Sequence, residues 1–237
     1  MNSNRKIARI AGVLFIIATV TVLVSQLFLG SISPSDDLRN ISAHQNQVIL
    51  GALFQVIAAF ACAGIAISLY PVLRKYNVGL ALGSVCFRTI EAMLYLIVVI
   101  VIGSLLSLSL EFVTTGASDA SYFHILGASL LSVRDGATLL AVIAFSLGAL
   151  MYYAIFYQSK LIPRWLSGWG VIGVILCLAA SMLVLFRLID LLSTVQVVLS
   201  LPIAVQEMVL AVWLIVRGFN ASAIVSLSAK TELAAIK

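Results

Sequence analysis

The sequence contains very little charge. Only 10% of its 237 residues are Asp, Glu, Lys or Arg, whereas soluble globular proteins average about 25%. Hydrophobic residues make up 62% of the chain, and the mean hydropathy is +1.17. Apolar runs of about 20 residues recur along the whole length, which is typical of helices that cross a membrane. This composition excludes an ordinary water-soluble domain, and the runs leave no room between them for a separate soluble catalytic domain.

Cysteine and histidine are also scarce. Cys62, Cys86 and Cys177 are odd in number, lie inside apolar runs and form no C-x-x-C pair, so neither a disulfide framework nor a zinc site is predicted. The only histidines are His44 and His124, and the chain has no H-E-x-x-H, P-loop, G-x-S-x-G or G-x-G-x-x-G motif. We therefore expect no metal and no cofactor, and no catalytic residue is assigned. An enzyme is the less favoured class.

The apolar runs predict an all-α fold, a polytopic bundle of six transmembrane helices. The expected spans are residues 8–29, 48–70, 78–110, 122–157, 167–186 and 195–217, which form a single domain, with a tail at 218–237. The third and fourth runs far exceed the roughly 20 residues that cross a 30 Å hydrocarbon core. We expect these two helices to project beyond one leaflet or to tilt strongly. The segment at 31–47 predicts either a short interfacial helix or an early start of the second span.

The net charge of +5 is distributed as in a membrane protein rather than a nucleic-acid-binding protein. Ten basic residues and a single acid, Glu232, fall on the side of the termini, whereas two basic residues and five acids fall on the other side. Because Lys and Arg accumulate in cytoplasmic loops, both termini are predicted to be cytoplasmic, and no nucleic-acid partner is expected. Aromatic residues on the same side predict an interfacial belt. They are Tyr152, Tyr153, Tyr157, Trp165 and Trp169.

Five ionisable residues lie within the spans or at their edges. They are Arg88, Glu91, Arg134, Asp135 and Glu207. A charge near the centre of a membrane helix costs about 3 kcal/mol on insertion, so such side chains face protein or water and indicate a functional site. For Arg134 and Asp135 we favour an interfacial pair that reaches toward the lipid headgroups.

The spacing of the polar residues places several of them together. Ser84, Arg88, Glu91 and Tyr95 are separated by four, three and four positions, so they share one face of the third span. Arg88 and Glu207 each lie about ten residues from the basic side, which puts both roughly 15 Å deep. The sequence leaves open whether these two side chains pair. The candidate ligand-binding residues are Arg88, Glu91, Tyr95, Asp135 and Glu207.

Three interpretations of these residues stay open. The first is a binding protein, and by extension a transporter, whose polar cavity takes a small molecule or a lipid headgroup. Arg88 would hold an anionic group, and Glu207 or Glu91 would exchange a proton. The second is an accessory or scaffolding protein in which the buried charges only hold helices in register. The third, less favoured, is an intramembrane enzyme that modifies lipid with a carboxylate as general base. Membrane lipid is the expected partner, and oligomerisation is left open.

Short motifs extend along nearly the whole chain. They are Arg5–Gly12 before the first span, Asn40-Ile41 before the second, Leu69-Tyr70 ahead of a basic loop, Phe87-Arg88-x-x-Glu91-Ala92 in the third span, and Ile162-Pro163-Arg164 before the fifth. In these the chain resembles a family of bacterial integral membrane proteins known as domain of unknown function 4386. The resemblance implies a multi-pass protein of the bacterial cytoplasmic membrane and marks Arg88 and Glu91 as motif residues. It implies no activity, substrate or cofactor.

Overall fold

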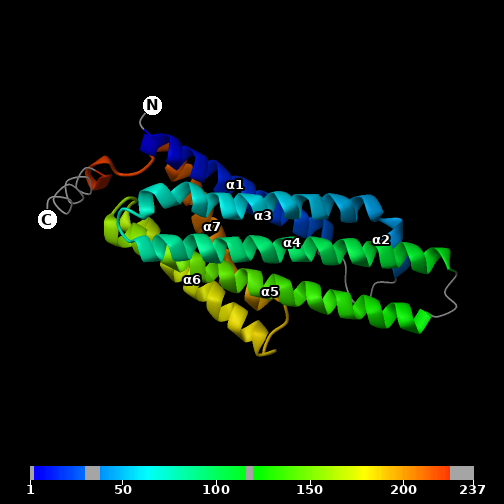
Figure 1. The fold of residues 1–237 in the computed structure, drawn as a ribbon. Helices are drawn as coiled ribbons and strands as arrows, with labels where there is room; N and C mark the ends of the chain where they lie inside the picture. Colours follow the sequence, from blue (N-terminus) through cyan, green and yellow to red (C-terminus); the bar gives the residue numbers. More distant parts are fainter. Residues whose placement is uncertain (1–2, 30–37, 116–119, 225–237) are drawn as a thin grey trace.

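The computed structural model describes residues 3–29, 38–115 and 120–224, and within these residues it contains helices and no strands. Of the seven helices in these residues, six are long and apolar enough to cross a membrane, and the short α2 is the exception. The all-α fold with six spans is therefore confirmed, and the predicted span ends differ from the helix ends by only a few residues (Figure 1). The helices are α1 (Ser3–Leu29), α2 (Leu38–Ala43), α3 (Gln45–Leu73), α4 (Val78–Thr114), α5 (Ala120–Ser159), α6 (Arg164–Leu185) and α7 (Thr194–Val216).

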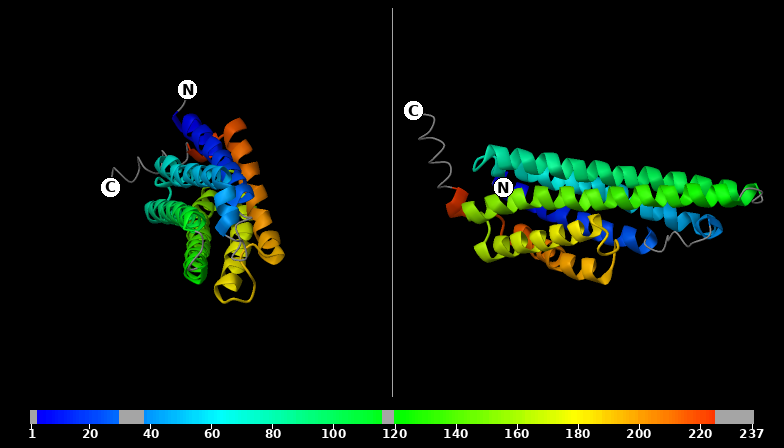
Figure 2. Two further views of the ribbon diagram at one scale, coloured as in Figure 1. Left: turned by 90° about the vertical axis from the view of Figure 1, so that its right-hand side faces the viewer. Right: turned by 90° about the horizontal axis from the view of Figure 1, so that it is seen from below.

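The six long helices pack as a closed ring in chain order. Each of them contacts the helix before it and the helix after it, and α7 closes the ring against α1 (Figure 2). Side chains from all six meet in one buried apolar cluster. Because lipid is as apolar as these side chains, close packing must hold such helices together. The ring therefore creates an interior that is shielded from lipid on every side.

Small residues allow the helices to approach closely at the ring contacts. A Cβ atom on Gly12 of α1 would lie 2.7 Å from the carbonyl oxygen of Ala211 in α7, and one on Gly173 of α6 would lie 3.0 Å from the backbone nitrogen of Ile203 in α7. Neither distance leaves room for a side chain. Glycine at these positions brings backbone directly against backbone, as expected for helices that associate within a bilayer.

The α3–α4 turn and the α5–α6 turn lie at one end of the ring, together with the start of α1 and the end of α7 (Figure 1). We call this end the basic end. Asn77 begins α4 by accepting a hydrogen bond from the Leu80 nitrogen at 3.0 Å, and Pro163 precedes the first turn of α6. Most of the basic residues that were predicted to share one side lie at this end. Arg39, Arg187, Glu111 and Asp190 lie toward the opposite end of the ring, which we call the far end. The basic-end residues are Arg5, Lys6, Arg9, Arg74, Lys75, Lys160, Arg164 and Arg217. That this end faces the cytoplasm stays a prediction.

Helices α4 and α5 project past the rest of the ring at the far end. They contain 37 and 40 residues, whereas α6 and α7 contain 22 and 23. At 1.5 Å per residue the first pair is roughly 55–60 Å long and the second roughly 33–35 Å long. Figure 2 shows α4 and α5 continuing well beyond the α6–α7 hairpin. A second apolar cluster, which includes Leu38, Leu105 and Phe112, packs the projecting part against α2.

The structure also describes two segments outside the spans. Both alternatives for the segment at 31–47 occur, since the short α2 is followed by α3, which begins at Gln45. The beginning of the tail is held in place, because the Asn220 nitrogen donates to the Leu161 carbonyl at 2.8 Å and the Tyr76 hydroxyl donates to the Ala223 carbonyl at 2.9 Å. Residues 31–37 of the first segment and residues 225–237 of the tail lie outside the described part of the chain.

Candidate functional site

Arg88 and Glu91 form a buried ion pair in the centre of the ring. The Arg88 Nη1 lies 3.0 Å from Glu91 Oε2, and each side chain is only 2% exposed. The residues are three positions apart on α4, a spacing at which side chains on one helix face meet. Arg88 lies ten residues after the first residue of α4, or about 15 Å along its axis. Helix α4 begins where the third span was predicted to begin, and the motif residues of this span contact one another. The depth of Arg88 in the bilayer stays a prediction.

Neighbouring helices enclose the guanidinium group of Arg88. Its Nε donates to the Cys62 carbonyl of α3 at 3.4 Å, and its Cζ lies 5.1 Å from the ring centroid of Phe145 in α5, within the range of a cation–π contact. Gly148 lets α5 come this close, because a Cβ there would stand 3.2 Å from Arg88 Cγ. A guanidinium has five N–H donors, and the contacts described here use only Nε and Nη1.

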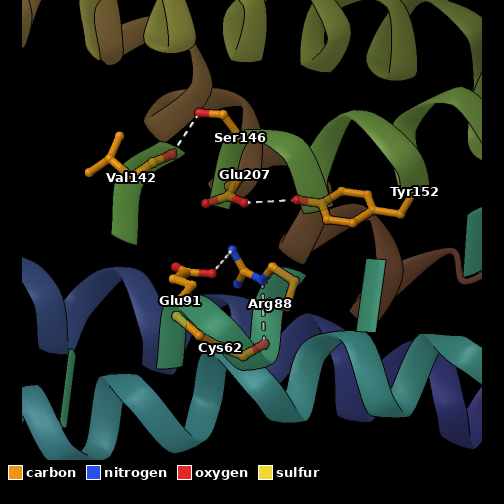
Figure 3. A network of polar contacts seen from close by, with 7 residues as sticks. All are labelled: Cys62, Arg88, Glu91, Val142, Ser146, Tyr152 and Glu207. Carbon is orange, nitrogen blue, oxygen red and sulfur yellow. Dashed lines mark hydrogen bonds and ion pairs between the residues drawn. The ribbon is translucent and has the colours of Figure 1, made fainter. Parts of the chain in front are cut away.

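Glu207 faces Arg88 from the opposite side of the interior, on α7. Its Oε1 accepts a hydrogen bond from the Tyr152 hydroxyl of α5 at 3.2 Å, and its side chain is 9% exposed. Figure 3 shows the Arg88 guanidinium and the Glu207 carboxylate turned toward one another, with Glu91 beside Arg88. The ion pairs found among the described residues are Arg88–Glu91 and Arg134–Asp135. Within the described chain, Glu207 is thus a buried carboxylate bonded to a neutral partner and not ion-paired.

A second polar contact lies beside the first. The Tyr153 hydroxyl donates to Gln206 Oε1, and Gln206 Nε2 donates to the Leu166 carbonyl of α6 at 2.9 Å. Both Tyr153 and Gln206 are fully buried. This chain of hydrogen bonds connects α5, α6 and α7 and leaves neither polar group of the amide unsatisfied. It fixes the rotation of α7 and therefore the direction in which Glu207 points.

Charge is not balanced in the buried interior. Arg88 carries one positive charge, whereas Glu91 and Glu207 carry two negative charges when both are ionised. Burying a charge without an opposite partner is costly, and the group then gains a proton or an ionic partner. One of the two carboxyl groups therefore has the chemical character of a site for a proton or for a cation.

Two other candidates lie in different surroundings. Tyr95 is 8% exposed, lies one helical turn beyond Glu91 and belongs to the buried apolar cluster that all six helices form. Within the described chain it makes no hydrogen bond to the charged residues. Asp135 is not part of the site. Its Oδ1 lies 2.8 Å from Arg134 Nη2, and the two side chains are 39% and 17% exposed respectively. Asp135 precedes Tyr152 on α5 by 17 residues, or about 25 Å.

The sequence analysis missed several of the residues that surround the cluster. Tyr152 and Tyr153 were assigned to an interfacial aromatic belt, which is wrong, because both are fully buried and hydrogen-bonded inside the ring. Tyr157 and Trp165 are 46% and 57% exposed, as a belt requires. The signal that separates the two kinds of tyrosine is helical phase. Tyr152 and Tyr153 each lie four residues after a buried residue, Gly148 and Ala149, and therefore on the inward face of α5.

Two surface hollows of the described residues lie away from the interior of the ring. One is at the turn between α5 and α6, and the other runs along the outer face of α7. No group of three or more His, Cys, Asp or Glu side chains in the described chain is placed to hold a metal ion. The arrangement is therefore a closed polar site, built by four helices, whose chemistry rests on Arg88, Glu91, Glu207 and Tyr152.

Comparison with known proteins agrees with this architecture. The family described as domain of unknown function 4386 matches the chain over residues 10–218. This range contains nearly all of the six-helix ring, together with Arg88, Glu91, Tyr152 and Glu207. No curated protein and no solved structure matches the chain. Because the match covers most of its length, this multi-pass membrane protein belongs to the domain of unknown function 4386 family.

Proposed function

We propose that this protein binds a small molecule inside the membrane at the Arg88–Glu91–Glu207 cluster, with Glu207 as the group that exchanges a proton for the ligand. The observation that carries the proposal is the charge of the cluster, one cation and two carboxylates in a shielded interior. Ionisable residues at this depth are costly and are found mainly where a protein binds or moves something.

The contacts favour a ligand with a positively charged group. Arg88 is engaged by Glu91 at 3.0 Å, so an anionic ligand would have to displace that carboxylate. Glu207 accepts only the neutral Tyr152 hydroxyl among its described contacts, so a proton or an ammonium group would neutralise it. A small molecule fits this depth better than a lipid headgroup, because the headgroup would have to enter the hydrocarbon core by about 15 Å.

Burial of the cluster is consistent with a carrier in its closed form. Arg88 and Glu91 are 2% exposed, so a ligand reaches them only after helices separate. Exchange of a proton for a cation at one carboxylate would then couple binding to release. This makes transport the natural extension of the binding proposal.

The experiment is native mass spectrometry of the protein purified in mild detergent, as the wild type, Glu207→Gln and Asp135→Asn. Asp135→Asn is the matched control, because it also removes one carboxylate but lies outside the cluster. We expect a bound mass on the wild type and on Asp135→Asn that is absent from Glu207→Gln. Its occupancy should fall as the pH is lowered, because protons compete for the same carboxylate. A mass retained by Glu207→Gln would contradict the proposal.

A scaffolding role is the second candidate, and the closed interior favours it. The Tyr152–Glu207 hydrogen bond connects α5 to α7, and the bond from Arg88 to the Cys62 carbonyl connects α4 to α3, without any ligand. If the wild type carries no bound mass at any pH, and substitutions in the cluster change only its thermal stability, the charges are structural. A lipid-modifying enzyme has less support, since neither of the two hollows described above opens at the cluster.

A further inference from the structure

Two hollows adjoin at the basic end, away from the buried cluster. The first has a volume of about 510 Å³, lies between the α5–α6 turn and the end of α7, and is lined in part by Lys160, Arg164 and Arg217. The second has a volume of about 480 Å³ and follows α7 from Val205 to Arg217. Trp213 and Arg217 line both hollows. The two therefore share a wall at the end of α7.

The first hollow is strongly positive. Its lining contains three cations and no acid. A fourth cation is adjacent, because Arg5 donates to the Val216 carbonyl at 2.5 Å and lies against Gly218, which also lines the hollow. Helix α6 begins here at Arg164, and Pro163 gives it no side-chain cap, so the positive end of the helix dipole lies at the same place. Such a hollow suits an anion.

The second hollow is apolar apart from Arg217. Its remaining lining residues are Val205, Met208, Val209, Val212, Trp213 and Val216. Val205 and Val216 are eleven positions apart on α7, or about 16 Å, which is half of a 30 Å hydrocarbon core. The groove therefore has the length of an acyl chain that occupies one leaflet. Val212 is 55% exposed on the protein surface, so a chain can reach the groove from the lipid.

We propose that the two hollows together form a binding site for an anionic phospholipid. The phosphate lies among Lys160, Arg164 and Arg217, and an acyl chain follows α7 toward the middle of the bilayer. Trp213 lines both hollows, and tryptophan rings favour the boundary between headgroups and hydrocarbon. This site is independent of the buried cluster and of the function proposed for it.

Lys160 lies directly after α5 in a left-handed conformation. Its φ is 57°, and glycine is the favoured residue in this conformation at the end of a helix. Arg187 and Leu192 adopt the same conformation outside the hollow, so the conformation does not by itself mark a ligand site. It makes Lys160→Gly a substitution that removes a charge from the hollow and that the backbone accommodates.

The test is native mass spectrometry of delipidated protein with added phosphatidylglycerol or phosphatidylcholine of the same acyl chains. The wild type should prefer phosphatidylglycerol by about tenfold, since basic residues near a membrane surface favour anionic lipid. Arg164→Gln/Arg217→Gln should lose this preference. Arg74→Gln/Lys75→Gln is the matched control, because it removes the same charge from the same end outside both hollows, and it should keep the preference. Val212→Trp, which fills the groove without changing charge, should weaken binding of both lipids.

Three results would overturn the proposal. Equal loss in Arg74→Gln/Lys75→Gln would show diffuse surface charge rather than a built site. Competition by soluble glycerol phosphate as strong as that by phosphatidylglycerol would show a site for free phosphate. A change from dimer to monomer in Val212→Trp, with lipid binding unchanged, would identify the groove as a contact between copies of the chain. If Arg164→Gln/Arg217→Gln does not fold, Val212→Trp and Lys160→Gly decide, because Lys160→Gly removes charge at a position that favours glycine.

Discussion

At the scale of single residues, Arg88 determines whether the buried interior is stable. Replacing it with methionine leaves Glu91 and Glu207 facing each other without a cation. Breaking a buried ion pair on one side costs about 3–5 kcal/mol, so we expect Arg88→Met to lower the free energy of unfolding by that amount. Unfolding in mixed detergent micelles, followed by circular dichroism, measures it.

The double variant Arg88→Met/Glu91→Leu serves as the control for this substitution. It replaces the whole pair with apolar side chains, and such replacements are often neutral or stabilising. We expect it to regain most of the stability that Arg88→Met loses. If the double variant is as unstable as the single one, lost packing rather than an unpaired charge explains the effect.

Tyr76 gives the basic end a dependence on alkaline pH. It lies in the turn between α3 and α4, where burial raises the pKa of its hydroxyl and the hydroxyl donates to the Ala223 carbonyl. The folded state favours the neutral phenol. The contribution of Tyr76 to the free energy of unfolding is therefore complete below the unfolded pKa of about 10, and it is lost as the pH rises through the higher folded pKa. We expect Tyr76→Phe to remove this part of the alkaline destabilisation. A series of melting temperatures across alkaline pH for both proteins tests this, and identical slopes would contradict it.

At the scale of elements, the contact between α5 and α6 positions the second hydrogen-bond network. A Cβ on Gly170 of α6 would collide with the ring of Tyr153, whose hydroxyl donates to Gln206. Overpacking of this kind costs about 1–3 kcal/mol, so we expect Gly170→Ala to lower the melting temperature. Gly103→Ala on α4 is the matched control, because nothing lies within 4 Å of its added Cβ. It should be neutral or slightly stabilising, and equal losses in both variants would refute the packing argument.

At the scale of the whole molecule, the different lengths of the helices determine how the ring sits in the bilayer. If α6 and α7 span the hydrocarbon, the last part of α4 must lie in water at the far end. Leu110 and Ile97 on α4 are similarly exposed on the protein, 40% and 42%, but they are thirteen positions apart along α4, or about 20 Å. We expect Leu110→Cys to react with a membrane-impermeant maleimide and Ile97→Cys not to react.

This labelling is done in a Cys86→Ala background, because Cys86 is exposed whereas Cys62 and Cys177 are buried. Reagent added from only one side of sealed vesicles also tests the predicted cytoplasmic position of the basic end. Absence of labelling at both cysteines from either side would show that α4 tilts within the membrane instead of projecting.

The sequence by itself determined the class, the six spans and the polar face of α4. Backbone hydrogen bonds must be satisfied within lipid, and an α-helix satisfies them within a single segment. Hydropathy and length therefore predict the spans well. The spacing of Arg88, Glu91 and Tyr95 was enough to place them on one inward face. The helical rise predicts the depth of Glu207, and this depth stays a prediction.

Only the tertiary structure decided which side chains meet. Periodicity fixes the face of a helix but neither its neighbours nor its rotation against them, so the sequence left open whether Arg88 pairs with Glu207. In the ring, Arg88 forms an ion pair with Glu91, and Glu207 accepts a hydrogen bond from Tyr152. The ring also separates Asp135 from the cluster and buries Tyr152 and Tyr153. The sequence could not predict this burial, because an aromatic residue near a helix end suits an interface and an interior equally. Packing against neighbouring helices selects between the two.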